Sequence, residues 1–301
     1  MNKNLVWIIV IVVLALAVFL IYNYWIAEEP LFNPAFTDVS VSVGNAAPIV
    51  GITALENPIP LEEGTTYQAN IDFNVVDPNG IPSSNLNDLL TLITFQYPTG
   101  GPYTESRTAS ISDCTTPLDI GQVRTYDCTI TMQYFDADGT WDVSVSVTDT
   151  SGATGTDTST TIVGVLKHII LTGGAPISFG AVAPAQADVV PTPTTVTNTG
   201  NYEGTISVTA FALEEPSAAP DKIPAANFKS AGSVESNVCA GVSTTTLVQA
   251  SATTIVSTSL PKGPAGSNNE DIKWCLDVPT GIISASYSTS VAPSQTWIIG
   301  I

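Results

Sequence analysis

The chain has 301 residues, enough for two domains of ordinary size, and its 27 acidic and 8 basic residues give a formal net charge of −19. This charge repels nucleic-acid phosphates and anionic lipid headgroups, which argues against DNA, RNA or polybasic lipid contacts. Only 12% of the residues are charged and 44% are hydrophobic. We interpret the acidic excess as a solvated exterior that keeps a surface protein soluble.

The first element is an unbroken apolar run, residues 5–22, with the sequence LVWIIVIVVLALAVFLIY. At 1.5 Å per residue, its 18 residues cover about 27 Å, close to the thickness of a bilayer core. Aromatic side chains suited to the membrane interface lie at both ends of the run. They are Trp7, Tyr22, Tyr24 and Trp25.

The charges around this run predict its orientation. Lys3 precedes it, Glu28 and Glu29 follow it, and the next basic residue is Arg107. The positive-inside rule then places the N-terminus in the cytoplasm and the rest of the chain outside the cell. Residues 1–27 are therefore predicted to be the single-pass signal anchor of a cell-membrane protein.

Two alternatives involve removal of the N-terminus. A cleaved signal peptide needs a small residue before the cut, where this chain has the bulky Trp25. A pilin-type leader would place a basic residue and then Gly or Ala just before the apolar run, and MNKNLVW has neither. Both patterns favour an uncleaved anchor.

The four cysteines indicate an oxidising location. No pair has the C-x-x-C spacing of a zinc or redox site. They fall two and two along the chain, so we predict the disulfides Cys114–Cys128 and Cys239–Cys275. Loops of this length stabilise the folded state by about 3 and 4 kcal/mol in the chain-entropy model. Buried free thiols are the alternative.

Residues 28–36, EEPLFNPAF, contain two prolines and are interpreted as a stalk. Beyond it, from TDVSVSV (37–43) onward, short runs alternate apolar and polar residues between turn signals, as in GTWDVSVSVTDTSG (139–152). Such alternation is typical of strands with one buried and one solvated face. Only SSNLNDLLTLITF (83–95) has the apolar spacing of a helix.

These patterns predict an all-β protein with two tandem immunoglobulin-like β-sandwich domains behind one transmembrane α-helix. The first sandwich is assigned to residues 37–166 and the second to residues 167–301. The boundary lies near GVLKHIILTGGAP, where Gly173-Gly174 and Pro176 loosen the chain. Asn198-Thr199-Gly200-Asn201 is interpreted as a hairpin turn between two strands.

The first sandwich resembles immunoglobulin-like domains of the polycystic-kidney-disease and bacterial cadherin-like type. NVVDPNG (74–80) and GTWDVSVSVTDTSGATGTDTSTTIVGVL (139–166) carry the resemblance. The W-D-F-G-D-G segment of that family is absent, and ITFQYPTGGPYTESRTAS stands in its place. The resemblance therefore implies the general immunoglobulin-like class.

The second sandwich resembles a type common in archaeal cell-surface proteins. PISFGAVAPAQADVVPTPTTVTNTGNYEGTISVTAFAL (176–213) and IKWCLDVPTGIISASYSTSV (272–291) carry this resemblance. The NTGNYEG element (198–204) is also similar to filament-forming subunits that complete one another's sheets with donor strands. The resemblance implies an archaeal surface protein or a filament subunit.

The sequence shows no catalytic motif. G-x-S-x-G, H-E-x-x-H and a glycine-rich phosphate loop are all absent. The single histidine, His168, lies in the expected linker and is interpreted as a solvated residue. We therefore expect no enzyme activity.

An extracellular calcium site is the one metal hypothesis. DADGTWD spaces three aspartates like the opening of a calcium loop, although the glutamate that closes an EF-hand is missing. Turn-forming aspartates without an ion are the alternative. The residues considered as ligands are Asp77, Asp136, Asp138 and Asp149.

Three functions follow from these features. The first is a non-enzymatic surface protein displaying β-sandwiches for adhesion or envelope structure. The second is a filament or pilus subunit assembled through the N-terminal helix or donor strands. The third is a carbohydrate-binding module with Trp274 and Trp297 as its platform, although tryptophans in strands more often fill a core.

Overall fold

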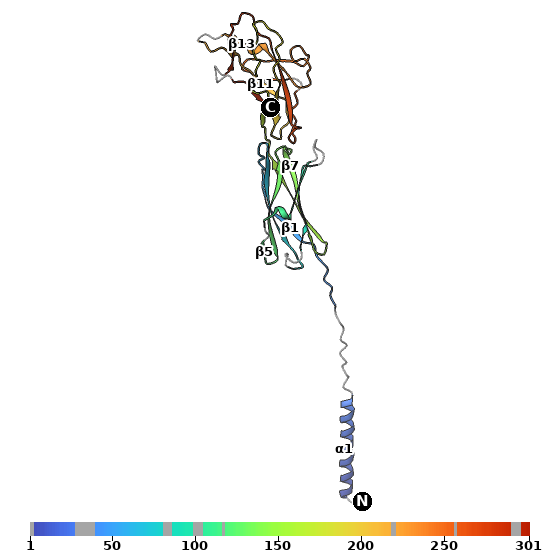
Figure 1. Ribbon diagram of the computed structural model, residues 1–301. Helices are drawn as coiled ribbons and strands as arrows, with labels where there is room; N and C mark the ends of the chain where they lie inside the picture. The colour runs from blue at the N-terminus through green and yellow to red at the C-terminus, as the bar shows by residue number, and fades with distance from the viewer. Residues whose placement is uncertain are drawn as a thin grey trace. The chain divides into compact units, whose positions relative to one another are not determined.

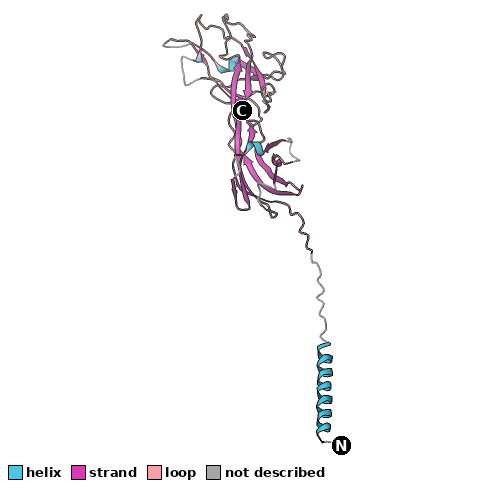
Figure 2. Cartoon of the chain, turned by 60° about the horizontal axis from the view of Figure 1, so that its bottom comes forward, coloured by secondary structure: helices cyan, strands magenta, loops and turns pink. Residues whose placement is uncertain are grey.

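The computed structural model has one N-terminal helix and many antiparallel strands, so the predicted all-β class with an N-terminal helix is confirmed (Figures 1 and 2). Two predicted segments, the stalk at 28–36 and the start of the TDVSVSV run, lie outside the residues that the structure describes. The described residues are 3–27, 40–80, 86–98, 105–115, 118–217, 221–255, 258–289 and 296–301.

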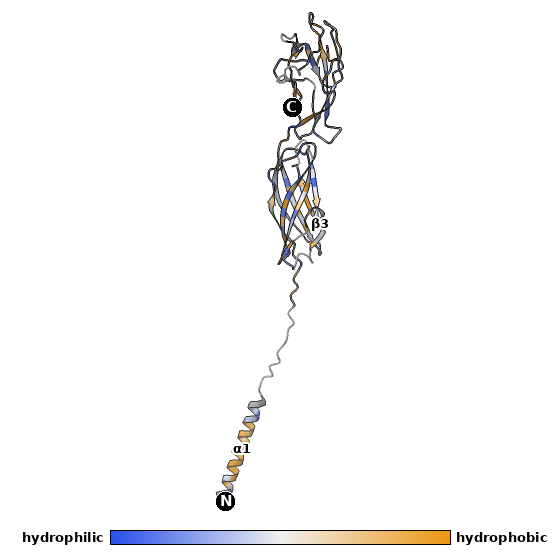
Figure 3. Ribbon diagram, turned by 60° about the vertical axis from the view of Figure 1, so that its left-hand side comes forward, coloured by the Kyte–Doolittle hydropathy of each residue, from blue (hydrophilic) through white to orange (hydrophobic). Residues whose placement is uncertain are grey.

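Helix α1 (Lys3–Ala27) is apolar along most of its length (Figure 3). Its stretch Val6–Tyr24 has a mean hydropathy of 2.8, none of it is buried, and it is long and apolar enough to cross a membrane. Trp7, Tyr22 and Tyr24 are all exposed. The side chain of Trp25 lies outside the described residues. The helix therefore has the length and composition of a membrane span or signal anchor.

Two four-stranded sheets face each other in the first sandwich. Four of their strands, β2, β3, β6 and β7, are each 11 residues long and run along the length of the sandwich (Figure 1). The sheet orders are β1-β2-β6-β5 and β4-β3-β7-β8. The strands are β1 (Ile49–Leu55), β2 (Thr66–Val76), β3 (Leu86–Gln96), β4 (Ser106–Ser110), β5 (Leu118–Ile120), β6 (Val123–Gln133), β7 (Gly139–Asp149) and β8 (Thr154–Val163).

Alternation in the sequence builds the core of this sandwich. In β7, Trp141, Val143, Val145 and Val147 are at most 1% exposed, and the polar residues between them lie on the outer face. Strand β2 does the same with Ala69, Ile71, Phe73 and Val75, each at 0%. The period-two pattern of GTWDVSVSVTD therefore predicted this strand correctly.

The described part of the segment 83–95 is not the helix that its apolar spacing indicates. Residues 86–96 form strand β3, which pairs with β4 and β7. Ile93 and Phe95 are fully buried in the sandwich core. Pairing with the 11-residue strand β7 and the five-residue strand β4 outweighs the local spacing, because strand preference depends strongly on tertiary context.

Shorter strands build the second sandwich. Its sheets have the orders β15-β14-β17-β10-β9 and β16-β11-β18, with a separate β12-β13 pair. The strands are β9 (Ile169–Gly173), β10 (Thr194–Asn198), β11 (Ser207–Thr209), β12 (Leu213–Glu214), β13 (Lys222–Ile223), β14 (Phe228–Ala231), β15 (Thr245–Thr246), β16 (Thr253–Thr254), β17 (Asn269–Leu276) and β18 (Ile298–Gly300). Single 3₁₀ turns occur at Ile111–Asp113 and Ala225–Asn227.

The turn predicted at 198–201 does not close a hairpin. Strand β10 pairs with β9 and β17, whereas β11 lies in the other sheet and pairs with β16 and β18. The turn instead carries the chain between sheets. Asn198 holds it by donating from Nδ2 to the carbonyl of Tyr202 at 2.8 Å.

The chain divides into two compact units, Met1–Gly44 and Asn45–Ile301. The second unit contains both sandwiches, each with its own hydrophobic core. Residues 40–48 belong to no strand, although their alternation resembles one. Val41 and Val43 are 80% and 85% exposed.

Candidate functional site

Asn201 is a central residue of the joint between the two sandwiches. Its Nδ2 donates to the carbonyls of Asp136 at 3.0 Å and Gly164 at 2.9 Å, and its Oδ1 accepts from the Leu166 amide at 2.6 Å. The residue is only 2% exposed. Next to it, a Cβ on Gly200 would lie 2.0 Å from the Leu166 carbonyl oxygen, so only glycine fits.

A second buried group links the sandwiches through Tyr134. Its hydroxyl donates to the Gly263 carbonyl at 2.8 Å and accepts from Asn268 Nδ2 at 3.1 Å. Asn268 also donates to the carbonyl of Asn198 at 2.5 Å. Burial raises the pKa of Tyr134 above its usual value, so the hydroxyl keeps its proton as a donor. Buried polar groups satisfied in this way fix one geometry.

Charged pairs surround the same joint. Asp136 is fully buried and accepts from Arg107 Nε at 3.0 Å, and Lys262 Nζ lies 3.1 Å from Glu105 Oε1. Burial raises the pKa of Asp136, and hydrogen bonds from Arg107 and the Gln133 amide act in the opposite direction.

His168 is part of the joint and differs from the expected solvated linker residue. Its Nε2 lies 2.9 Å from Glu63 Oε2, and its Nδ1 lies 2.6 Å from Thr199 Oγ1. Glu63 comes from the first sandwich and Thr199 from the second. The single histidine of the chain therefore has two structural partners.

The disulfides pair as the sequence predicts. Cys114–Cys128 joins the edge of the first sandwich to β6, and Cys239–Cys275 joins a loop to β17 in the second. No free cysteine occurs among the described residues. Cys239 and Cys275 form a small core of their own with Ala231 and Val238.

The structure does not bring the four proposed calcium ligands together. Asp136 lies at the joint with Arg107, and Asp138 is exposed next to it. Asp77 and Asp149 lie at the opposite end, about 33 Å away along the 11 residues of β7. Among the described residues, the one group of three potential metal ligands is Asp188 with Cys239 and Cys275, whose sulfurs form a disulfide.

Asp77 and Asp149 act as turn residues. Asp149 accepts from Asn45 Nδ2 at 2.6 Å and from the amides of Ser151 and Ala153. These bonds, chiefly the one from Asn45, lower the pKa of Asp149. Asp77 accepts from the Asn79 amide through Oδ1, while its Oδ2 is buried and accepts no hydrogen bond from the described residues. Two carboxylates at this end fall short of a calcium shell.

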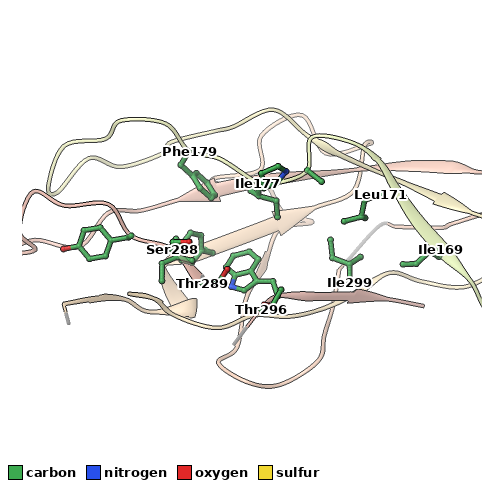
Figure 4. Close-up of a pocket in the computed structure, with 14 residues that line it drawn as sticks. Ile169, Leu171, Ile177, Phe179, Ser288, Thr289, Thr296 and Ile299 are labelled. Atoms are coloured by element: carbon green, nitrogen blue, oxygen red, sulfur yellow. The ribbon is translucent and has the colours of Figure 1, made fainter. Parts of the chain in front are cut away.

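A pocket of about 370 Å³ opens between the edge strands β9 and β18 of the second sandwich (Figure 4). Ile169, Leu171 and Ile299 lie along one part of it, and Phe179 and Ser288 along another. None of its described lining residues is an acid, a lysine, an arginine or a histidine. Such a pocket suits apolar side chains.

The two tryptophans of the second sandwich do not form an exposed platform. Trp274 is fully buried and donates from Nε1 to Thr194 Oγ1 at 2.9 Å. Trp297 donates to the Phe211 carbonyl at 2.7 Å, and its ring centroid lies 5.8 Å from that of Trp274. Trp274 belongs to the core, and Trp297 packs against that core and lines the pocket.

Comparisons with known proteins leave the family open. No protein-family model matches the chain, and no curated protein matches its sequence significantly. Among solved structures, the chain is similar to Escherichia coli alpha-2-macroglobulin activated by porcine elastase, at 12% identity and a TM-score of 0.27. That match covers 79% of this chain and 20% of the other, so the chain spans about a fifth of its length.

Two further structures share a similarly low likeness. A carbohydrate-binding module of the β-sandwich superfamily has 16% identity and a TM-score of 0.23, over 81% of this chain and 99% of the module. The secreted serine protease VesC from Vibrio cholerae has 8% identity and a TM-score of 0.22, over 89% and 51%. Likeness at this level carries no argument about activity or ligand.

Proposed function

We propose that this protein is a non-enzymatic, single-pass membrane protein that displays two β-sandwiches outside the cell, for adhesion or as part of the cell envelope. The observation that carries this proposal is α1, with an apolar stretch at Val6–Tyr24 that is exposed throughout. A soluble protein would bury such a helix. Two disulfides in the remainder of the chain support an oxidising location.

The joint supports display rather than catalysis. His168 and Asp136, the residues with the most evident acid–base chemistry, are each held by structural partners between the sandwiches. Asn201 and Tyr134 add buried hydrogen bonds across the same boundary. A protein that presents a surface away from the membrane benefits from sandwiches that do not swing freely. The proposed first sandwich is of the polycystic-kidney-disease or cadherin-like type, and the second of the archaeal cell-surface type.

Protease treatment of intact cells tests this topology. We expect fragments beginning after residue 28 to be released, while a cytoplasmic marker stays intact. Protection of the sandwiches until lysis would contradict the proposal.

A variant pair tests the anchor itself. Leu14→Lys with Val18→Lys places two charges within α1, each costing roughly 2.5–3.5 kcal/mol at the centre of a membrane helix. We expect the chain to leave the membrane fraction, whereas the apolar control Leu14→Ile with Val18→Leu stays in it. Equal fractionation of the two variants would show that α1 does not hold the protein in a membrane.

A filament subunit is the second candidate, and the open pocket between β9 and β18 favours it. Subunits that assemble by strand donation need an unfilled sheet edge over an apolar core. Negative-stain microscopy of material sheared from cells, with antibody against this chain, checks for fibres. Labelled fibres would establish the candidate, and their absence would leave the display proposal alone.

A further inference from the structure

A strand-like segment precedes the first sandwich without a partner. In the sequence, TDVSVSV alternates valine with polar residues over 37–43. Val41 and Val43, in its described part, are 80% and 85% exposed, and residues 40–48 belong to no strand. Alternating valines of this kind are suited to a sheet with one buried face. The described part of this segment, residues 40–43, therefore has the composition of a strand and pairs with no described strand.

The second sandwich has two open sheet edges next to an apolar pocket. Strand β9 pairs with β10 on one side, and β18 pairs with β11 on one side, while neither has a second neighbour among the described strands. The apolar pocket lies between these two edges and is lined by Ile169 and Leu171 of β9 and Ile299 of β18. Figure 4 shows these three side chains along the same part of the pocket. An open edge over apolar side chains is a template for strand addition.

We propose that the segment carrying Val41 and Val43 of one copy adds as a strand along β9 of a second copy and places its valines in the pocket. The proposal deepens the filament candidate above and rests on it, because it names the donor, the acceptor and the partner. Ser40 and Ser42 would face solvent, as the serines of β7 do. The added strand satisfies the free backbone groups of the β9 edge.

The length of the chain excludes the same copy as the donor. Asn45 and Ala46 are fixed to Asp149 and Asn79 at one end of the first sandwich. Val43 is three residues from Ala46 and so lies within about 10 Å of it. The pocket begins at Ile169, beyond the joint at the other end of β7, and the 11 residues of β7 alone span about 33 Å. The donor must therefore come from another chain.

Donor and acceptor are different surfaces of one chain, so the contact is heterologous. Each copy can donate to one neighbour and accept from another, which makes the assembly open-ended unless its rotation closes a ring.

Charge substitution in the donor provides the first test, with the full chain in detergent. Val41→Asp with Val43→Asp puts two carboxylates where the pocket needs apolar side chains, and both sites lie outside the folded sandwiches. We expect sedimentation velocity to show self-association weakened by at least about tenfold. The matched control, Ser40→Asp with Ser42→Asp, adds the same charge on the solvent face and keeps most of the association. Equal behaviour of the two variants, or a native chain that stays monomeric, would overturn the proposal.

Crosslinking provides the second test, because no described cysteine of the native chain is free. A chain with Val41→Cys and a differently tagged chain with Leu171→Cys are mixed and oxidised. We expect a mixed disulfide dimer with Leu171→Cys and little with Ile170→Cys, which occupies the opposite face of β9. Equal yields from the two acceptors would overturn the proposal. Both tests measure self-association of the chain in detergent. Their outcome does not depend on surface display, which the protease experiment on intact cells tests separately.

Discussion

The two sandwiches reach a closed core by different means. The first uses four strands of 11 residues, whose ladders pair almost end to end. The second has one strand of eight residues, β17, and others of two to five residues. Its core also contains Trp274, which hydrogen-bonds to Thr194 of β10, Trp297, which hydrogen-bonds to the loop residue Phe211, and a buried disulfide. The long strands of the first sandwich form the centre of its two sheets, whereas in the second sandwich the short edge strands β9 and β18 border an apolar pocket.

The joint lets each sandwich support the other. Asn201 of the second sandwich accepts a hydrogen bond from the Leu166 amide and donates one to the Asp136 carbonyl. Lys262 of the second sandwich forms an ion pair with Glu105 of the first. Hydrogen bonds across the joint therefore add to the strand pairing within each sandwich. Four sets of substitutions separate the contributions of the buried ion pair, the disulfides, the joint and a pair of facing carboxyls to stability.

Arg107→Leu is expected to have the largest effect. Asp136 is fully buried, and Arg107 is the cation that contacts it. Removing one partner of a buried pair typically costs about 3–5 kcal/mol, because an uncompensated charge remains. Chemical denaturation measures the loss. The double variant with Asp136→Asn should recover part of it, and a cost below about 1 kcal/mol would show that the pair is effectively solvated.

Loss of the disulfides should distinguish the sandwiches. Cys239→Ser with Cys275→Ser opens a loop of sequence separation 36, and Cys114→Ser with Cys128→Ser opens one of 14. The chain-entropy model gives losses of about 4 and 3 kcal/mol, respectively. Hydrogen exchange should show the second sandwich opening further than the first, since its short strands hold fewer ladder bonds. The reverse order would contradict the comparison.

Asn201→Ala tests the coupling across the joint. The substitution removes three hydrogen bonds and leaves the Leu166 amide without its acceptor, at a cost of about 1–3 kcal/mol. Calorimetry should show the sandwiches melting in two separated steps. The exposed control Asn70→Ala, on the outer face of β2 in the first sandwich, should keep the native melting pattern. A single unchanged transition for Asn201→Ala would show that the joint carries little coupling.

Asp127→Asn should have the smallest effect and depend on pH. Asp127 lies opposite Asp72 across β2 and β6, and burial, followed by the charge and hydrogen bond of Asp127, raises the pKa of Asp72. A raised folded-state pKa favours folding below the unfolded pKa and loses that contribution as pH rises. At neutral pH, the unfolding free energy of the variant should therefore exceed that of the native chain by up to about 1 kcal/mol. The difference should vanish below about pH 3.9, where Asp72 is protonated in both the folded and the unfolded chain.

Prediction from sequence succeeded where the relevant contacts are periodic. The alternation in 139–149 specifies β7 and its buried Trp141, and the apolar run specifies α1. Prediction from sequence failed for β3. Its leucines have a helical spacing, but β3 pairs with β4 and β7 and is therefore a strand. The NTGN turn contains two joint residues, Asn198 and Asn201, and its turn chemistry gave no hint of partners 60 or more residues away.

The pocket was equally hidden from the sequence. An edge is open only when no later strand covers it, and neither Ile169 nor Ile299 reveals that locally. The arrangement of the proposed calcium ligands was hidden for the same reason. Spacing in DADGTWD describes neighbours along the chain, whereas Asp136 precedes the start of β7 and Asp149 is its last residue.

Labelling of single cysteines in intact cells tests the central claim most directly. Val242 is fully exposed in the second sandwich, and Asn2 precedes α1. Because the four native cysteines form disulfides, Val242→Cys or Asn2→Cys adds one free thiol to the chain. A membrane-impermeant maleimide should label Val242→Cys in intact cells and Asn2→Cys only after permeabilisation. Labelling of Asn2→Cys alone in intact cells, or of neither variant before lysis, would contradict the account of an anchored surface protein.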